Sequence, residues 1–79
     1  MKKKVLRYFA EIYTEKDTYT AIFEGINDMN DYIGTIVGAV EASSYDDGLV
    51  VLYSDNEFSE AIRSHEIMGY KTYSKYIKE

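Results

Sequence analysis

Two stretches near the start of the chain alternate between apolar and polar residues. Residues 5–14 place Leu6, Tyr8, Ala10 and Ile12 on one face, and residues 19–26 alternate in the same way. Successive side chains of a strand point to opposite faces, so each stretch is predicted to be a strand. The polar segment Glu15-Lys16-Asp17-Thr18 joins them and predicts a hairpin with a four-residue loop. The fold must therefore be organised around a sheet.

The next segment is predicted to be a helix. Asn27 or Asp28 can cap its start, and apolar residues then recur at helical spacing to about Ser44. After Asp46-Asp47-Gly48 the run Leu49-Val50-Val51-Leu52-Tyr53 is continuously apolar and has the length of a strand. Such runs are typical of interior strands, so we expect this one to be covered on both faces.

A second helix is predicted after this strand. Ser54-Asp55-Asn56-Glu57 has the spacing of a capping box, and Gly69 suits the left-handed position that ends many helices. The inner side of this helix would comprise Phe58, Ala61, Ile62 and His65.

The last segment, residues 70–78, matches both a helix and a strand. A strand is favoured because Gly69 would already have ended the helix and because Tyr and Thr suit a pleated surface. The predicted order is therefore ββαβαβ, one α+β domain over residues 1–79. Its mixed, mostly antiparallel sheet would carry two helices on one face.

The composition excludes several kinds of chemistry. The 79 residues include no Cys and one His, which excludes disulfides, iron–sulfur clusters and multi-His metal sites. No apolar run approaches the about 18 residues of a membrane span. We expect a soluble, cytoplasmic protein with no cofactor, no metal and no membrane partner.

The net charge of −5 is unevenly distributed along the chain. Residues 1–7 carry +4, residues 8–66 carry −11 and residues 67–79 carry +2. The basic first strand could pair with the basic C-terminal segment as a solvated sheet edge. The negative field of residues 8–66 disfavours nucleic acid as a direct ligand of the acidic surface and favours a basic protein partner.

Three acidic residues have no local structural role in the sequence. Capping and helix dipoles account for Asp28, Asp31, Asp55 and Glu57, which lie at predicted helix starts. In contrast, Glu41, Asp46 and Asp47 lie at or beyond the C-terminal end of the first helix, where the dipole disfavours anions. The basic first strand could neutralise them, a basic partner could do so, or Asp47-Gly48 could be simple turn chemistry.

Two glycines lie on the flank of the first helix, away from its apolar side. Gly34 and Gly38 share this flank with Asp31, Thr35 and Tyr45, so the outer side is smooth. Such a strip can serve as a docking face, or it can be tolerated in a helix held by its inner face alone. The nine tyrosines also suit a contact surface, although a thin core would use them too. The predicted partner-binding residues are Asp31, Gly34, Gly38, Glu41, Tyr45, Asp46 and Asp47.

We predict no catalytic or metal-binding residues. Abundant carboxylates alone do not make an acid–base pair, and no stretch matches a calcium loop. We interpret His65 as a packing or capping residue at the end of the predicted second helix.

One stretch of ten residues resembles a known family. Ala61-Ile62-Arg63-Ser64-His65-Glu66-Ile67-Met68-Gly69-Tyr70 is similar to the Ala-Ile-x-x-Tyr-Glu-x-x-Gly-Phe segment of GNAT acetyltransferases, with His65 in place of the Tyr. The resemblance implies a helix followed by Gly and a strand. The chain lacks the Gln/Arg-x-x-Gly-x-Gly/Ala loop that holds coenzyme A in that family, so acetyl transfer is not implied.

The sequence predicts a small, acidic, non-enzymatic module that binds and inhibits or regulates a basic partner, such as a nucleic-acid-binding complex. Viral anti-defence proteins of the anti-CRISPR kind, antitoxins and nuclease immunity proteins are similar in size and charge, and some inhibitors of this kind mimic DNA. A self-associating module, for example a homodimer, is the alternative. A third is an acetyltransferase-like remnant or small-molecule binder.

Overall fold

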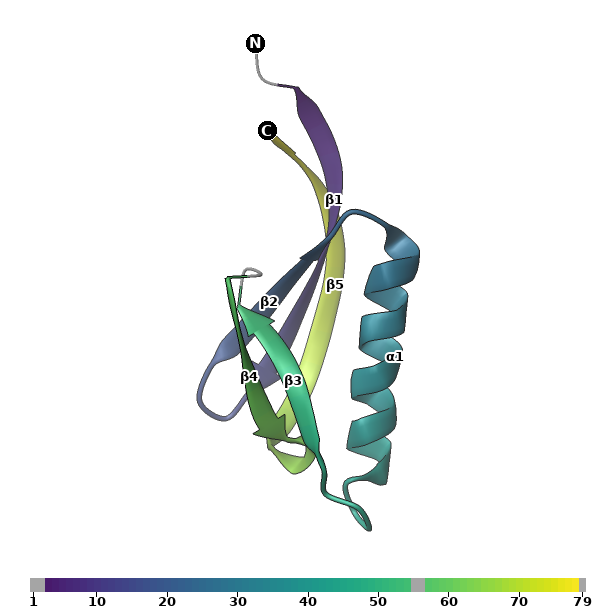
Figure 1. Cartoon of the computed structure of the whole chain (residues 1–79), viewed down its shortest axis with the longest axis vertical. Coiled ribbons are helices and arrows are strands. Elements are labelled where there is room, and N and C mark those ends of the chain that lie inside the picture. Colours follow the sequence, from purple (N-terminus) through teal and green to yellow (C-terminus); the bar gives the residue numbers. More distant parts are fainter. Residues whose placement is uncertain (1–2, 55–56, 79) are drawn as a thin grey trace.

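A computed structural model describes residues 3–54 and 57–78 as one small α+β domain with the order ββαβββ (Figure 1). Its elements are β1 (Lys4–Thr14), β2 (Thr18–Phe23), α1 (Ile26–Ala42), β3 (Leu49–Ser54), β4 (Phe58–Arg63), the single 3-10 turn η1 (Ser64–Glu66) and β5 (Ile67–Lys78).

A three-stranded antiparallel sheet, with the order β2-β1-β5, forms one layer of the domain. The predicted strand is confirmed as β1, and Ala10 and Ile12 of one face are fully buried, although Phe9 on the opposite face is buried as well. The β1–β2 turn is closed by Thr14, whose hydroxyl donates to the carbonyl of Asp17 at 2.8 Å and accepts the amide of Asp17 at 3.1 Å. The strand predicted for residues 70–78 is also confirmed as part of β5.

Helix α1 is confirmed, but it begins differently from the prediction. Gly25 in an extended conformation is the N-cap residue, and it makes no side-chain hydrogen bond. The amide of Met29 donates to the carbonyl of Gly25, so the helix starts before Asn27 and Asp28 can cap it. Met29 and Ile36 are the buried residues of its inner face.

The predicted second helix is wrong, because residues 58–63 form strand β4. β4 pairs with β3 in antiparallel register, with Ile62 opposite Val50. The amide of Glu57 donates to the carbonyl of Ser54 at 3.0 Å, which closes a hairpin turn where a capping box was expected. Residues 55 and 56 of that box lie outside the described residues. Pairing with β4 satisfies backbone groups of β3, which a helix in this position would leave open.

The resemblance to the acetyltransferase segment does not extend to its shape. Ala61 lies in a strand, only residues 64–66 form a helical turn, and Gly69 lies inside β5. His65 therefore sits in η1 and does not face the core, since its side chain is more than half exposed.

The expectation that β3 is covered on both faces is also wrong. β3 belongs to a separate two-stranded sheet with β4, and its residues alternate between buried and exposed. Val50 and Leu52 point into the core, whereas Leu49, Val51 and Tyr53 are 67%, 48% and 39% exposed. A run of apolar residues therefore becomes an apolar outer surface.

The core lies between the three-stranded sheet, α1 and the β3–β4 hairpin. Its central members are Ile12, Tyr19, Ile36, Val50, Leu52 and Ile67. Figure 1 shows α1 along one side of the molecule with β5 and β3 to its left, while the paired ends of β1 and β5 extend beyond the rest. The domain is accordingly elongated, with extents of 52 × 23 × 16 Å.

Candidate protein-binding site

The outer face of α1 gathers several of the predicted partner-binding residues. Asp31, Gly34, Gly38 and Glu41 are all exposed, and at 3.6 residues per turn they span an arc of about 80°. A Cβ atom built on Gly34 or Gly38 would meet nothing within 4 Å. Tyr45, in the turn after the helix, is 84% exposed. We call this surface, with Asp28 at its N-terminal end, the α1 strip.

An apolar groove borders the α1 strip on the side of β3. Its volume is about 360 Å³, and its lining includes Thr35 and Ala39 from α1 and Leu49, Val51 and Tyr53 from β3. Tyr32 also lines this groove, and its ring packs at a tilt against the ring of Tyr53, with centroids 5.7 Å apart. We call this the β3 groove.

The hydroxyl of Tyr32 is buried and finds no hydrogen-bond partner of normal geometry among the described residues. Burial raises the pKa of Tyr32, and the neighbouring Tyr53 backbone only partly opposes this effect. A buried hydroxyl without a partner is a costly feature, and a polar group of a bound molecule could satisfy it.

A second apolar groove borders the α1 strip on the side of β5. Its volume is about 210 Å³, and Val37, Val40 and Glu41 face Met68 and Tyr70 across it. Met68 is 72% exposed and Tyr70 is half exposed. Thus an acidic, glycine-containing ridge lies between two apolar grooves.

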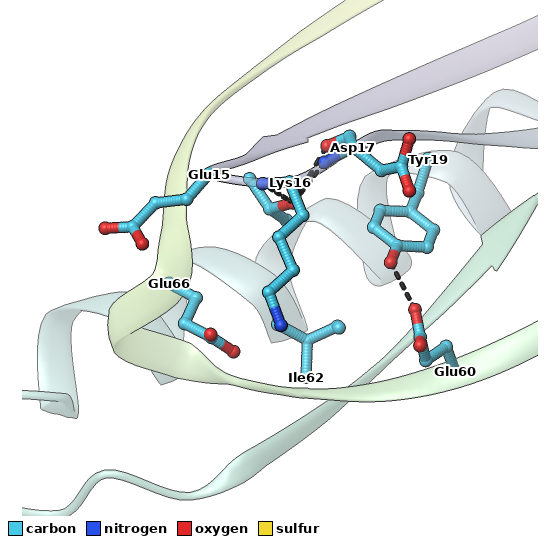
Figure 2. Close-up of a pocket in the computed structure, with 8 residues that line it drawn as sticks. Glu15, Lys16, Asp17, Tyr19, Glu60, Ile62 and Glu66 are labelled. Carbon is cyan, nitrogen blue, oxygen red and sulfur yellow. Dashed lines mark hydrogen bonds between the residues drawn. The ribbon is translucent and has the colours of Figure 1, made fainter.

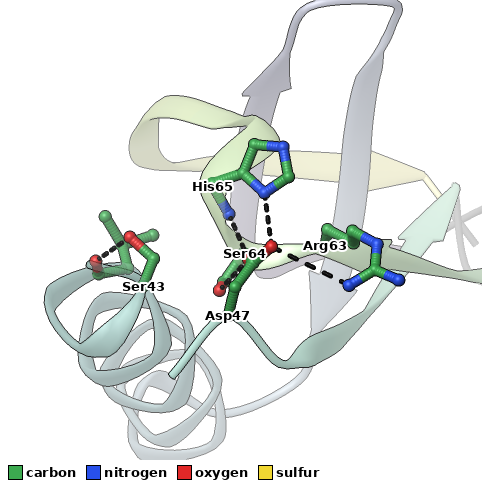
Figure 3. A network of polar contacts seen from close by, with 6 residues as sticks. Ser43, Asp47, Arg63, Ser64 and His65 are labelled. Atoms are coloured by element: carbon green, nitrogen blue, oxygen red, sulfur yellow. Dashed lines mark hydrogen bonds and ion pairs between the residues drawn. The ribbon is translucent and has the colours of Figure 1, made fainter. Parts of the chain in front are cut away.

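The carboxylate of Asp47, one of the predicted partner-binding acids, is held by hydrogen bonds to residues of the same chain (Figure 3). Its Oδ1 accepts the Ser64 hydroxyl and the His65 amide, each at 3.1 Å, and its Oδ2 lies 2.6 Å from Nδ1 of His65. Arg63 contributes a longer contact of 3.8 Å. The hydrogen bond from His65 is the main cause of a pKa of Asp47 below its usual value.

The sequence leaves open which bases neutralise the acids after α1, and this network identifies them for Asp47. The bases that reach Asp47 come from β4 and η1, not from the basic first strand. Glu41 and Asp46 remain exposed, and the described residues form no ion pair with either. The chain has no Lys or Arg between Lys16 and Arg63, so the residues of the α1 strip contribute only negative charge.

The Asp47 network resembles a catalytic triad in composition but not in arrangement. The Ser64 hydroxyl is fully buried and donates to the carboxylate, not to the imidazole. A nucleophile must instead contact its base and reach a substrate. These three residues therefore tie the chain after α1 to the start of η1.

A small polar pocket lies between the β1–β2 turn and β4 (Figure 2). Glu15, Asp17, Glu60 and Glu66 surround Lys16 there, and the hydroxyl of Tyr19 donates to the Glu60 carboxylate. Its volume of about 110 Å³ is below the about 300 Å³ of typical small-molecule sites. No group of three potential metal ligands occurs among the described residues.

The sequence did not indicate either groove. Leu49, Val51 and Met68 were expected in the interior or in a helix, and only the pairing of β3 with β4 and the length of β5 expose them. Residues 58–63 show no regular alternation of apolar and polar residues, because Glu60 lies between Phe58 and Ile62, so no pattern in the sequence identifies this segment as a strand.

Comparison of the chain with protein-family models, with curated proteins and with solved structures finds no match in any of the three. Within the described residues, no helix is long and apolar enough to cross a membrane.

Proposed function

We propose that this protein is a non-enzymatic binding module that captures a basic protein on the α1 strip and its two flanking grooves. Binding would cover the basic surface of the partner and so regulate or inhibit it. The observation that carries the proposal is the arrangement of exposed carboxylates on a ridge between two apolar grooves. Nucleic-acid-handling proteins are basic and are suited to this surface by charge.

The two kinds of surface have different roles in such a complex. Carboxylates at Asp31, Glu41 and Asp46 would steer a positively charged partner and speed association. Apolar side chains of the partner would enter the grooves, where Tyr53 and Tyr70 can act as aromatic anchors. Gly34 and Gly38 would let the partner backbone approach the helix closely.

The proposal is tested by affinity capture from a cell lysate with matched charge reversals. The test variant is Asp31→Lys with Glu41→Lys. The control is Glu15→Lys with Asp17→Lys, which changes the net charge equally on exposed residues of the β1–β2 turn. Retained proteins are identified by mass spectrometry at about 50 mM and about 200 mM salt.

A basic protein that is retained by the wild type and the control, lost from the test variant and weakened by salt would support the proposal. Equal retention by the two variants, or retention independent of salt, would contradict it. Gly38→Leu adds a second arm, since it fills the ridge at a position with open space and should weaken the same capture.

Self-association is the second candidate, favoured by the exposed apolar side of β3 and by the position of β5 at the edge of its sheet among the described strands. Exposed edges of this kind can pair with another copy. Sedimentation equilibrium separates the two functions. A stable homodimer that Gly38→Leu or Val51→Lys dissociates would favour self-association, and a monomer at all concentrations would exclude it.

A further inference from the structure

The described residues near the two ends of the chain pair with each other in β1 and β5 and are rich in bases. Residues 3–10 and 67–78 contain no acid, and they carry Lys3, Lys4, Arg7, Lys71, Lys75 and Lys78. We call this paired segment of β1 and β5 the basic ribbon. Met68 and Tyr70 at one end of this segment line a groove beside the α1 strip, whereas its other end, residues 4–7 and 75–78, takes no part in the proposed protein binding.

One end of the basic ribbon extends beyond the rest of the sheet (Figure 1). β2 pairs with β1 only from Tyr8 onward, whereas β5 pairs with β1 down to Lys4. Four residues of each strand therefore project as a two-stranded ribbon, a length of about 13 Å at the rise of an antiparallel strand. Two strands without a third layer are only marginally stable in water.

The register of the ribbon places like charges opposite each other. Lys4 pairs with Lys78 on one face, and Arg7 pairs with Lys75 on the other. Directly opposed like charges destabilise a strand pair. Glu24 offsets one of them through a 3.8 Å contact with Arg7. An anion placed along the ribbon would relieve the remaining repulsion and strengthen the pairing.

Two lysines of the ribbon are held above aromatic rings. Phe9 and Tyr73 stack with centroids 5.0 Å apart, and the ammonium of Lys75 lies 5.0 Å from the Phe9 ring. Lys71 lies 5.6 Å from the Tyr73 ring. Both lysines remain exposed, so the cation–π contacts orient their charges without burying them. Less side-chain entropy is then lost when they bind an anion.

We propose that the basic ribbon binds duplex DNA, with the ribbon in the major groove and its lysines on the flanking phosphates. The major groove of B-DNA is about 12 Å wide and admits a two-stranded ribbon. Duplex DNA carries one negative charge per about 1.7 Å, so it can engage lysines of both ribbon faces at once. A second copy of the chain fits the ribbon less well than DNA does, because its acidic helix offers only a few carboxylates on one face.

The acidic body does not cancel this attraction at physiological salt. The Debye length there is about 8 Å, and the domain is 52 Å long with the ribbon projecting from its end. The inference goes beyond the proposed protein binding and can fail independently of it. A protein with both activities would bring a basic partner and a DNA backbone to opposite parts of one small domain.

The test measures fluorescence anisotropy of a labelled duplex of about 20 base pairs from about 50 mM to about 200 mM salt. We expect binding that weakens by at least about 100-fold over this range if five lysines contact phosphates. Lys4→Gln, Lys75→Gln and Lys78→Gln should each reduce the slope of log affinity against log salt by about 0.9, and the triple variant by about 2.7. The control Lys16→Gln removes an exposed base from the β1–β2 turn and should leave the slope unchanged.

Chemical-shift mapping of the wild type with the same duplex keeps the proposal testable if the triple variant folds poorly. Shifts at Lys75, Tyr76 and Lys78 would support it. Absence of binding at the lowest salt, an equal effect of Lys16→Gln, or shifts confined to other parts of the chain would overturn it. If the wild type forms oligomers and binds no DNA, and the triple variant is a monomer, the proposal is overturned and a second copy is the occupant of the ribbon.

Discussion

Asp47 and His65 are joined by a 2.6 Å contact between Oδ2 and Nδ1, although 17 residues separate them along the chain. The same carboxylate accepts the His65 amide, so one side chain fixes both the backbone and the ring of the other residue. This contact attaches the loop after α1 to the turn that precedes β5. It accounts for an acid that the sequence could assign to a turn, to the first strand or to a partner.

The Asp47 contact predicts a loss of stability in acid. Its pKa is lowered in the fold, so it stabilises the folded state above the usual carboxyl range, and this contribution disappears as the pH falls through the lowered pKa. Urea unfolding between about pH 6 and about pH 2 should show a smaller decrease for Asp47→Asn than for the wild type. Glu41→Gln, which removes an exposed carboxylate outside the network, should decrease like the wild type. Equal slopes for Asp47→Asn and the wild type would contradict the role given to this contact.

A second pH effect is expected in alkali, at Tyr19. Its hydrogen bond to Glu60 raises the pKa of Tyr19 to about 12 and joins β2 to β4. Because the neutral form is favoured in the fold, the stabilisation is complete below about pH 10 and is lost as the pH rises through about 12. Absorbance titration of phenolate formation should lose its last step in Tyr19→Phe and show that step at lower pH in Glu60→Ala. An unchanged titration in both variants would exclude the contact.

Replacing Gly34 by alanine should stabilise the protein. The position has open space, and alanine in an exposed helix interior is favoured over glycine by about 1 kcal/mol. Thermal and urea unfolding of Gly34→Ala should therefore show higher midpoints than the wild type. Ile36→Ala, on the buried side of the same helix, is the contrasting variant and should cost about 2–5 kcal/mol. Destabilisation by Gly34→Ala would mean that the helix packs against something on its outer side.

The strand conformation of residues 58–63 is tested at Ala61. This residue is exposed and lies opposite Val51, so threonine or valine there should improve cross-strand packing by about 0.2–1 kcal/mol. In a helix the same β-branched residues would be destabilising. Urea unfolding of Ala61→Thr therefore distinguishes the two conformations. A lower midpoint than the wild type would favour the helix.

Where local periodicity had a single interpretation, the fold could be predicted. Residues 5–14 alternate so regularly that β1 and its buried Ala10 and Ile12 follow directly, and the pattern after Asn27 identifies α1. Residues 58–63 have no regular alternation, and the apparent capping box before them favoured a helix. Their strand conformation depends on β3, which needs a partner strand that only the tertiary fold can supply.

The candidate site likewise contains residues that the sequence could predict and residues that it could not. Exposure of Asp31, Gly34 and Glu41 follows from the helical period, and the structure places them on one surface. The binding of Asp47 could not be predicted, because His65 and Arg63 approach it only once β4 has formed. The grooves depend on alternate exposure in β3 and on the path of β5, which are properties of packing.

The absence of backbone pairing between the two sheets, over the described residues, has a dynamic consequence. The β3–β4 hairpin is attached by the side chains of Val50 and Leu52, by the Asp47 network and by the Tyr19–Glu60 hydrogen bond, so it can detach as a cooperative unit while the three-stranded sheet stays intact. Amide protons of β3 and β4 should then exchange by this subglobal opening, ahead of those of β1. A ligand that spans the β3 groove would slow their exchange by holding this hairpin against α1.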